Sequence, residues 1–190
     1  MKRLGATKLV RSPRVVNAAV AGCAALAVLA LPADARAPAL KPTSRVSVDG
    51  LGPVRIGMTK GQAERAAGTR IVDDGRPSDG CSYAEPRDRR IQAAFMLIDN
   101  RVARVDVYKR GVRSQSGVRV GDSQASVRRR LAGRLTISRH KYNRSGFYLE
   151  ERPRSTADAN RRVLYETDGR RITRFRGGRL PEVRYVEGCG

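Results

Sequence analysis

The sequence is poor in the residues from which interfaces and metal sites are often built. It contains no tryptophan, three phenylalanines, six tyrosines and one histidine among 190 residues. Tryptophan and tyrosine dominate the energetics of many protein interfaces, so few aromatic anchors are present. The single histidine, His140, and the absence of any C-x-x-C spacing do not supply the usual ligands of zinc. Because His140 stands in the polar stretch 138–141, we interpret it as a surface residue.

Signatures of catalysis and of cofactor binding are missing as well. The chain has no glycine-rich phosphate loop, and one histidine leaves little choice of base for a nucleophile. Asp73, Asp74 and Asp79 lack the spacing of a calcium loop, and the glycines and proline among them predict a turn. Glu150 and Glu151 are either an acid and base pair or a solvated strand end. We therefore expect no enzyme, no cofactor, no metal and no small-molecule substrate.

The one long apolar run lies at the N-terminus. Five basic residues and no acidic one precede the uncharged segment 18–31. This arrangement is typical of a secretory signal peptide, and Ala33-Asp34-Ala35 provides an A-x-A cleavage site before Arg36. A second A-x-A site, Ala35-Arg36-Ala37, is disfavoured because Pro38 would follow the cut.

Two other fates of this segment are open. An uncleaved anchor needs about 20 apolar residues, and this run is shorter and rich in alanine. Val20-Ala21-Gly22-Cys23 resembles a lipobox, which would make Cys23 the site of lipidation, but most of the apolar stretch follows the cysteine. We expect residues 1–35 to be a cleaved leader and the protein to be secreted or periplasmic.

Cysteine usage is consistent with export. With Cys23 in the leader, Cys81 and Cys189 are the two that stay in the mature chain. An even number of cysteines in an oxidising compartment predicts a disulfide, and two cysteines allow only one pairing. On the chain-entropy model, closing so long a loop stabilises the fold by roughly 4–5 kcal/mol.

The chain is strongly basic. Residues 36–190 carry 34 lysines and arginines against 17 aspartates and glutamates. Such an excess attracts anionic surfaces, among them nucleic acid, lipid head groups and acidic glycans. Genome composition explains the same excess, because 33 of the 39 basic residues in the chain are arginine. Arginines also alternate with apolar residues in segments such as 101–105, which is typical of the solvated side of a sheet.

One pattern occurs twice after a proline-containing linker at 36–46. Residues 54–59 and 118–123 both read V-R-[IV]-G-x-[TS], 64 residues apart. We therefore predict two repeats, residues 47–112 and 113–190.

A short helix is expected after each copy of this pattern. In the first, Thr59 and Gln62 form a capping box. In the second, Asp122 or Ser123 is the cap, and the helix is one residue longer. Both helices are expected to stop at a glycine, at Gly68 and Gly133 respectively.

Strand patterns follow each helix. Ile71-Val72 and Leu135-Thr136-Ile137 come first, and each repeat then contains a hairpin around a tight turn, Asp99-Asn100 or Asp168-Gly169. The segments that should pair are 91–98 with 101–108 and 162–167 with 170–175. A last strand is expected at 183–186. The predicted core residues are Val102, Val105, Val107, Ile172 and Phe175. Each repeat is then a short helix on an antiparallel β-sheet, an α+β fold.

These motifs resemble the β-lactamase-inhibitory-protein-like superfamily, which also contains small outer-membrane assembly lipoproteins. The shared pattern is G-M-[TS], a short helix ending at glycine, and strands joined by a D-[GN]-x-V turn. It fits Gly57-Met58-Thr59 to Gly68 with 99–102, and more loosely 121–133 with 168–172. The resemblance covers roughly residues 48–180. It implies a tandem α+β fold and a binding role, in which the inhibitors of the superfamily use a concave sheet.

The remaining aromatic residues cluster with basic ones. Arg139, Tyr142, Arg144 and Tyr148 have the composition of an interface hot spot, and we name them as candidate partner-binding residues. The alternative is that Phe147 belongs to the core and the tyrosines form its amphipathic rim. We expect an exported, non-catalytic module that binds a protein or a cell-envelope component. The other readings are a protein that binds polyanions or an anionic membrane surface and, with less support, a secreted hydrolase.

Overall fold

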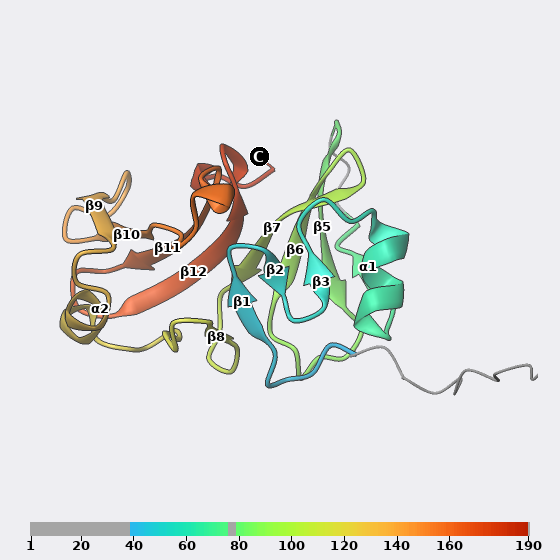
Figure 1. The fold of residues 1–190 in the computed structure, drawn as a ribbon, viewed down its shortest axis with the longest axis horizontal. Coiled ribbons are helices and arrows are strands. Elements are labelled where there is room, and N and C mark those ends of the chain that lie inside the picture. Colours follow the sequence, from blue (N-terminus) through green and yellow to red (C-terminus); the bar gives the residue numbers. More distant parts are fainter. Residues whose placement is uncertain (1–38, 76–78, 190) are drawn as a thin grey trace, which may run out of the picture. The chain divides into compact units, whose positions relative to one another are not determined.

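The computed structural model describes residues 39–75 and 79–189, which form an α+β fold (Figure 1). The predicted leader, with Cys23 and the cleavage-site residues Ala33, Ala35 and Arg36, lies outside these residues. Across 39–75 and 79–189, no helix has the length and apolar character needed to cross a membrane.

The larger of the two sheets has eight antiparallel strands in the order β4-β5-β6-β7-β12-β11-β10-β9. Helix α1 (Lys60–Ala67) precedes the first four strands along the chain, and helix α2 (Gln124–Arg130) precedes the last four. The two sets of four meet where β7 pairs with β12. The strands are β4 (Ile71–Asp73), β5 (Cys81–Pro86), β6 (Ala94–Ile98), β7 (Arg101–Val107), β9 (Leu135–Arg139), β10 (Phe147–Glu151), β11 (Arg161–Thr167) and β12 (Ile172–Arg179).

A smaller sheet of four short strands packs against this junction. Its order is β3-β2-β1-β8, and β1 contacts β12 while β2 contacts β7. Gly177 permits the close approach, because a Cβ there would lie 2.5 Å from the carbonyl oxygen of Ser47. Leu40, in the segment assigned to a linker, is buried, and β1 begins inside that segment. The strands are β1 (Arg45–Ser47), β2 (Gly50–Leu51), β3 (Val54–Arg55) and β8 (Arg113–Ser114).

Both helices begin where local chemistry predicts. Thr59 caps α1 with the reciprocal Gln62 bond, and Gly68 ends it in the left-handed conformation. Ser123 caps α2. The predictions of a longer second helix and of a glycine stop were wrong, since α2 has seven residues against eight in α1 and is capped at Leu131. Beyond Arg130 the last turn tightens, with hydrogen bonds from the Ala132 amide to Arg129 and from the Arg134 amide to Leu131, and Gly133 within it has positive φ.

The two hairpins are present, with shifted ends. Asp99 and Asn100 both have positive φ, as the tight turn requires. Strand β6 starts later than predicted because residues 91–93 make local turn hydrogen bonds. In the second hairpin, pairing resumes only at Ile172, because the Asp168 carboxylate accepts hydrogen bonds from the backbone amides of Arg170 and Arg171.

The predicted last strand at 183–186 was wrong. This segment begins with a 3₁₀ turn, η2 (Glu182–Arg184), and then runs on without strand pairing. Its carbonyl groups accept hydrogen bonds from two arginine side chains, Arg104 and Arg176, and not from a neighbouring strand. The chain also contains a second 3₁₀ turn, η1 (Thr156–Asp158).

The apolar side of the large sheet forms the core with the helices and the small sheet. All five residues predicted for the core are buried, and Ala63, Ala67, Val127 and Leu131 join them from the helix segments. Each strand thus has one apolar face to bury, and the opposite face of the sheet is left for other uses.

Candidate binding face

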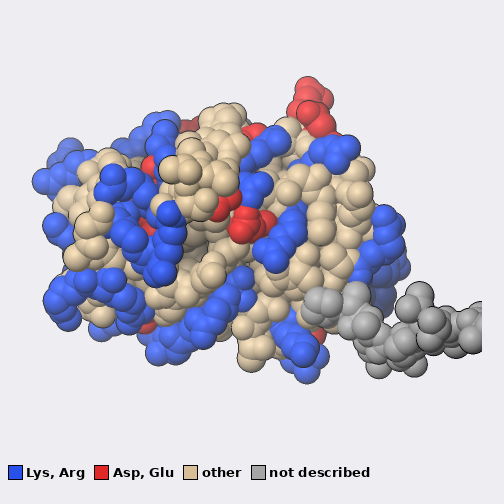
Figure 2. All heavy atoms as spheres, in the orientation of Figure 1, with Lys and Arg blue, Asp and Glu red and all other residues tan. Residues whose placement is uncertain are grey.

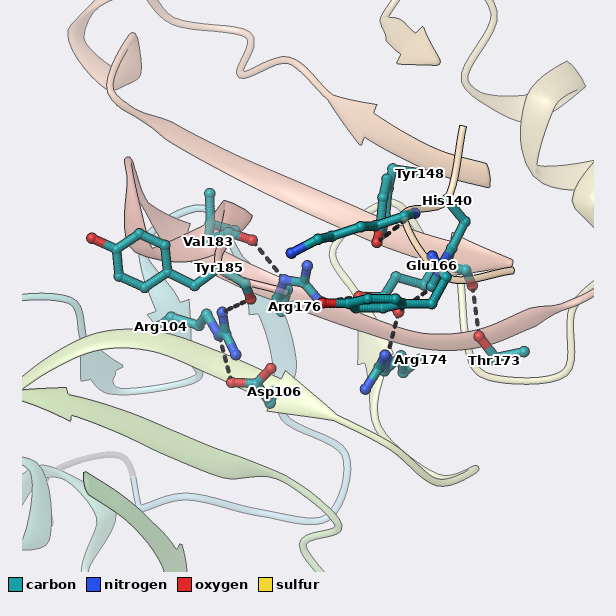
Figure 3. A network of polar contacts seen from close by, with 12 residues as sticks. Arg104, Asp106, His140, Tyr148, Glu166, Thr173, Arg174, Arg176, Val183 and Tyr185 are labelled. Carbon is teal, nitrogen blue, oxygen red and sulfur yellow. Dashed lines mark hydrogen bonds and ion pairs between the residues drawn. The ribbon is translucent and has the colours of Figure 1, made fainter. Parts of the chain in front are cut away.

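The second face of the large sheet, which we call the polar face, carries charged and phenolic side chains (Figure 3). Along β7, for example, Arg104 and Asp106 alternate with the core residues Val105 and Val107. The polar-face residues that contact one another come from β5, β7, β10, β11, β12 and the residues that follow β7 and β9. They are Tyr83, Arg104, Asp106, Tyr108, His140, Tyr148, Glu166, Arg174 and Arg176.

Arg104 is the centre of one buried cluster. Its side chain is 2% exposed, and its Nε atom donates to Asp106 Oδ2 over 2.8 Å. Its Nη1 atom donates to the carbonyl oxygens of Glu182 and Tyr185, at 2.7 and 2.8 Å, and its Nη2 atom donates to the Tyr83 hydroxyl. Every guanidinium nitrogen therefore has a partner, which offsets the cost of burying the charge.

Glu166 is the centre of a second cluster. Its side chain is buried, and it accepts hydrogen bonds from Arg176 and Arg174, while His140 Nε2 lies 3.2 Å from Oε2. Burial raises the pKa of Glu166, but the charges and hydrogen bonds of Arg176 and Arg174 outweigh burial and hold it below its ordinary value. The carboxylate therefore stays ionised on the polar face.

Two phenols next to Asp106 stay protonated. Burial, with the negative charge of Asp106, raises the pKa of Tyr83. The pKa of Tyr108 is raised as well, by partial burial, by Asp106 and by the neighbouring Tyr83, although 46% of the residue is exposed. These hydroxyl groups act as hydrogen-bonding groups and not as bases at neutral pH.

The C-terminal strap, residues 180–189, crosses the polar face. Arg176 Nε donates to the Val183 carbonyl oxygen over 2.6 Å, and Arg184 makes two 2.8 Å hydrogen bonds to Glu150. The strap ends in the Cys81–Cys189 disulfide, with the two Cα atoms 5.5 Å apart. The predicted cysteine pair is therefore bonded, and it fastens the strap to β5.

Three exposed tyrosines surround the polar face: Tyr185 belongs to the strap, Tyr142 contacts it, and Tyr108 neighbours Tyr83. Tyr108, Tyr142 and Tyr185 are 46%, 60% and 42% exposed. Among residues 39–75 and 79–189, five large apolar or aromatic residues are exposed, and these tyrosines are three of them. Tyr142 donates to Glu187 of the strap, and Lys141 lies 5.0 Å from the centre of the Tyr142 ring. The polar face therefore has exposed tyrosines around arginines that are buried and held in place by hydrogen bonds.

The four residues named as candidate partner-binding residues are separated by the fold. Tyr148 lies on the polar face, stacked on the His140 ring with centroids 4.6 Å apart. Arg139 lies instead over Phe147, 4.8 Å from the ring centre, and donates to the Arg144 carbonyl oxygen. Phe147 packs against the core, as the alternative interpretation expected. Tyr142 and Tyr148 are the members that border the polar face.

Three interpretations based on polarity were wrong. His140 is not a surface residue, because its side chain is 9% exposed against Tyr148 and Glu166. Arg104, assigned to the solvated side of a sheet, is buried. Glu150 and Glu151 are neither a converging pair nor a solvated strand end, since successive strand residues point to opposite faces.

Each of these two glutamates is neutralised on its own face. Hydrogen bonding by Arg184 lowers the pKa of Glu150 despite partial burial, and Arg162 adds to this effect. Glu151 accepts hydrogen bonds from Tyr165 and Ser116 and pairs with Arg134 at 2.7 Å. Burial, with the charge of Glu151, raises the pKa of Tyr165.

A hollow of about 460 Å³ lies beside Glu151. Both carboxylate oxygens of Glu151 have partners, and the residue therefore stabilises the fold.

Three residues at the centre of the polar face were not among the predicted site residues: Asp106, Glu166 and Arg176. A usable signal was present, because a single acid stands inside each of two arginine-rich strand segments. A lone acid in such a segment is typical of a buried charge that needs its neighbours.

No protein-family model matches the chain, and no curated protein matches it. Two solved structures are similar to it at 13% sequence identity. The uncharacterized protein YfeY from Escherichia coli superposes with a TM-score of 0.47, over 71% of this chain and 99% of that one. An extracellular protein with an SCP domain from Bacillus anthracis superposes with a TM-score of 0.41, over 66% of this chain and 44% of that one.

Proposed function

We propose that this chain is an exported, non-catalytic binding module that recognises an acidic surface of a partner protein through the tyrosines around its polar face. The observation that carries the proposal is the exposure of Tyr108, Tyr142 and Tyr185 at the margin of a face whose centre holds buried arginines. Tyrosine and arginine are enriched among interface hot spots. The disulfide supports an oxidising compartment, and the leader-like residues 1–35 supply the route to it.

The charge of the module supports an acidic partner. Lysine and arginine cover much of the surface drawn in Figure 2, most densely over the half built from β9 to β12, and few acidic residues interrupt them. Around the exposed tyrosines, Lys141 and Arg184 are themselves more than half exposed. A partner with acidic side chains would therefore be steered to this face.

The architecture supports a tandem module. Each V-R-[IV]-G-x-[TS] segment is followed by a capped helix and four antiparallel strands. We propose that residues 47–112 and 113–190 are two repeats joined edge to edge, related to the β-lactamase-inhibitory-protein-like superfamily. In such a module the polar face extends across both repeats.

The test compares capture of extracellular and envelope proteins by the wild type, a Tyr142→Ala/Tyr185→Ala variant, and a Val72→Ala control. Val72 is exposed on the edge strand β4, at the opposite edge of the sheet from β9 and β10, between which Tyr142 lies in the sequence. A partner counts when the wild type and the control retain it and the tyrosine variant does not. The purified partner should bind the tyrosine variant at least tenfold more weakly.

Two results would contradict the proposal. One is equal retention of every captured protein by the tyrosine variant. The other is retention of heparin or anionic vesicles, lost as salt rises and unaffected by the tyrosine changes, with no protein captured. That second result would favour a polyanion-binding protein.

A further inference from the structure

A small pocket lies on the polar face beneath the C-terminal strap. Its volume is about 250 Å³, below the range of pockets that enclose drug-sized ligands. Strands β9, β10, β11 and β12 contribute six of its lining residues, and the strap contributes two. The lining residues are Thr136, Ser138, Tyr148, Glu150, Leu164, Arg176, Arg184 and Val186.

Arg176, one of the lining residues, has an unpartnered donor. Its side chain is 3% exposed, its Nε atom donates to Val183, and its Nη1 atom donates to Glu166. Its Nη2 atom is buried and has no hydrogen-bond partner among the described residues, and Figure 3 shows only the other two contacts. A buried guanidinium N–H group without an acceptor is costly, so an acceptor at this point would be stabilising.

The one acid that lines the pocket is already neutralised. Glu150 Oε1 accepts from Arg162 Nε at 3.1 Å and from Arg184 Nη2 at 2.8 Å, and its Oε2 accepts from Arg184 Nε. Glu166 is likewise shared between Arg174 and Arg176, so four arginines pair with two carboxylates at this pocket and leave an excess of positive charge. An anionic acceptor fits this balance better than a neutral one.

The other lining groups indicate which class of anion the pocket would bind. Hydroxyl groups of Thr136, Ser138 and Tyr148 offer further donors, whereas Leu164 and Val186 are apolar. We infer that the pocket binds a small monocarboxylate, with its carboxylate on Arg176 and a short apolar body against Leu164 and Val186. This inference does not depend on the proposed protein partner.

The direct test is an NMR titration of the ¹⁵N-labelled, disulfide-bonded protein with sodium butyrate at constant ionic strength. Saturable shifts are expected for amides of Ser138, Tyr148, Leu164 and Val186, with a Kd on the order of 1 mM. Butyramide, which has the same size without the charge, should bind at least tenfold more weakly, and inorganic phosphate should not compete.

A pocket-filling variant provides the second arm. Ser138→Leu changes an exposed position on the edge strand β9 and leaves the buried ion clusters intact. It should weaken butyrate binding at least tenfold. The control is Ile137→Ser on the same strand, whose side chain points to the other face and whose affinity should equal that of the wild type. Equal binding of butyramide, preferential binding of phosphate, or unchanged affinity in Ser138→Leu would each overturn the inference.

Discussion

At the scale of single residues, the polar face depends on charges that cannot be separated. Glu166 is fully buried and contacts two arginines and a histidine, while Arg104 is buried against Asp106 and two backbone carbonyl groups. Arginine suits these positions because its planar group donates in several directions at once. Removing one charge leaves its partners buried without compensation.

Glu166→Gln is therefore expected to destabilise the fold strongly. The change keeps the size of the side chain but leaves Arg176 without its counter-charge, and the free energy of unfolding should fall by about 3 kcal/mol. Guanidinium unfolding followed by circular dichroism measures the loss. Glu187→Gln is the matched control at an exposed ion pair and should change little. A wild-type midpoint for Glu166→Gln would show that the cluster contributes no net stability.

The Glu166 carboxylate should also make the free energy of unfolding depend on pH. Its pKa is lower in the folded protein than in the unfolded chain, so the unfolded chain binds protons first as pH falls. Stability from Glu166 is fully present above the ordinary glutamate pKa of about 4.3 and is lost as pH falls below it. Unfolding curves between pH 7 and pH 3 should show this loss for the wild type, and Glu166→Gln should show a smaller decrease.

At the scale of elements, local chemistry decided where the helices begin, and hydrogen bonds from arginine side chains decided the path of the strap. Both caps agree with prediction because a side-chain oxygen of Thr59 or Ser123 needs only the backbone amide three residues ahead. The end of α2 differs because its last turn tightens to three-residue hydrogen bonds before Gly133 is reached. The strap differs more, since a β-like pattern at 183–186 was overridden by donors from the distant strand β7 and from the preceding strand β12.

The Thr59 cap offers a test at this scale. Thr59→Ala removes the side-chain acceptor for the Gln62 amide, and the free energy of unfolding should fall by about 1 kcal/mol. Thr59→Ser keeps the hydroxyl group and should stay close to the wild type. Equal losses in the two variants, measured by chemical unfolding, would assign the effect to the threonine methyl group and not to the cap.

At the scale of the whole described fold, the polar face exists because two sets of four strands pair at β7 and β12. That pairing places Asp106 opposite Arg176, and Gly178 opposite Arg104. The strap then covers the junction, and the disulfide holds it there across 108 residues of sequence. Both proposed activities, protein binding by the tyrosines and carboxylate binding beneath the strap, use this arrangement.

Removing the disulfide should therefore cost more than any single cap. A Cys81→Ser/Cys189→Ser variant should lose about 4 kcal/mol of unfolding free energy on the chain-entropy model. The reduced wild type should show the same loss, and reductant should not affect the variant. Mass spectrometry after alkylation reports the bond directly: two thiols that react without reductant would contradict it.

Features that depend on near neighbours or on residue counts could be predicted from the sequence. These were the α+β class, both helix starts, the Asp99-Asn100 turn, the five named core residues and the Cys81–Cys189 pair, because each follows from local hydrogen bonding, periodicity or number. Which polar residues are buried became clear only from the three-dimensional arrangement of the strands. Arg104, His140 and Glu166 look solvated in sequence, and only strand pairing brings together the charges that make their burial affordable.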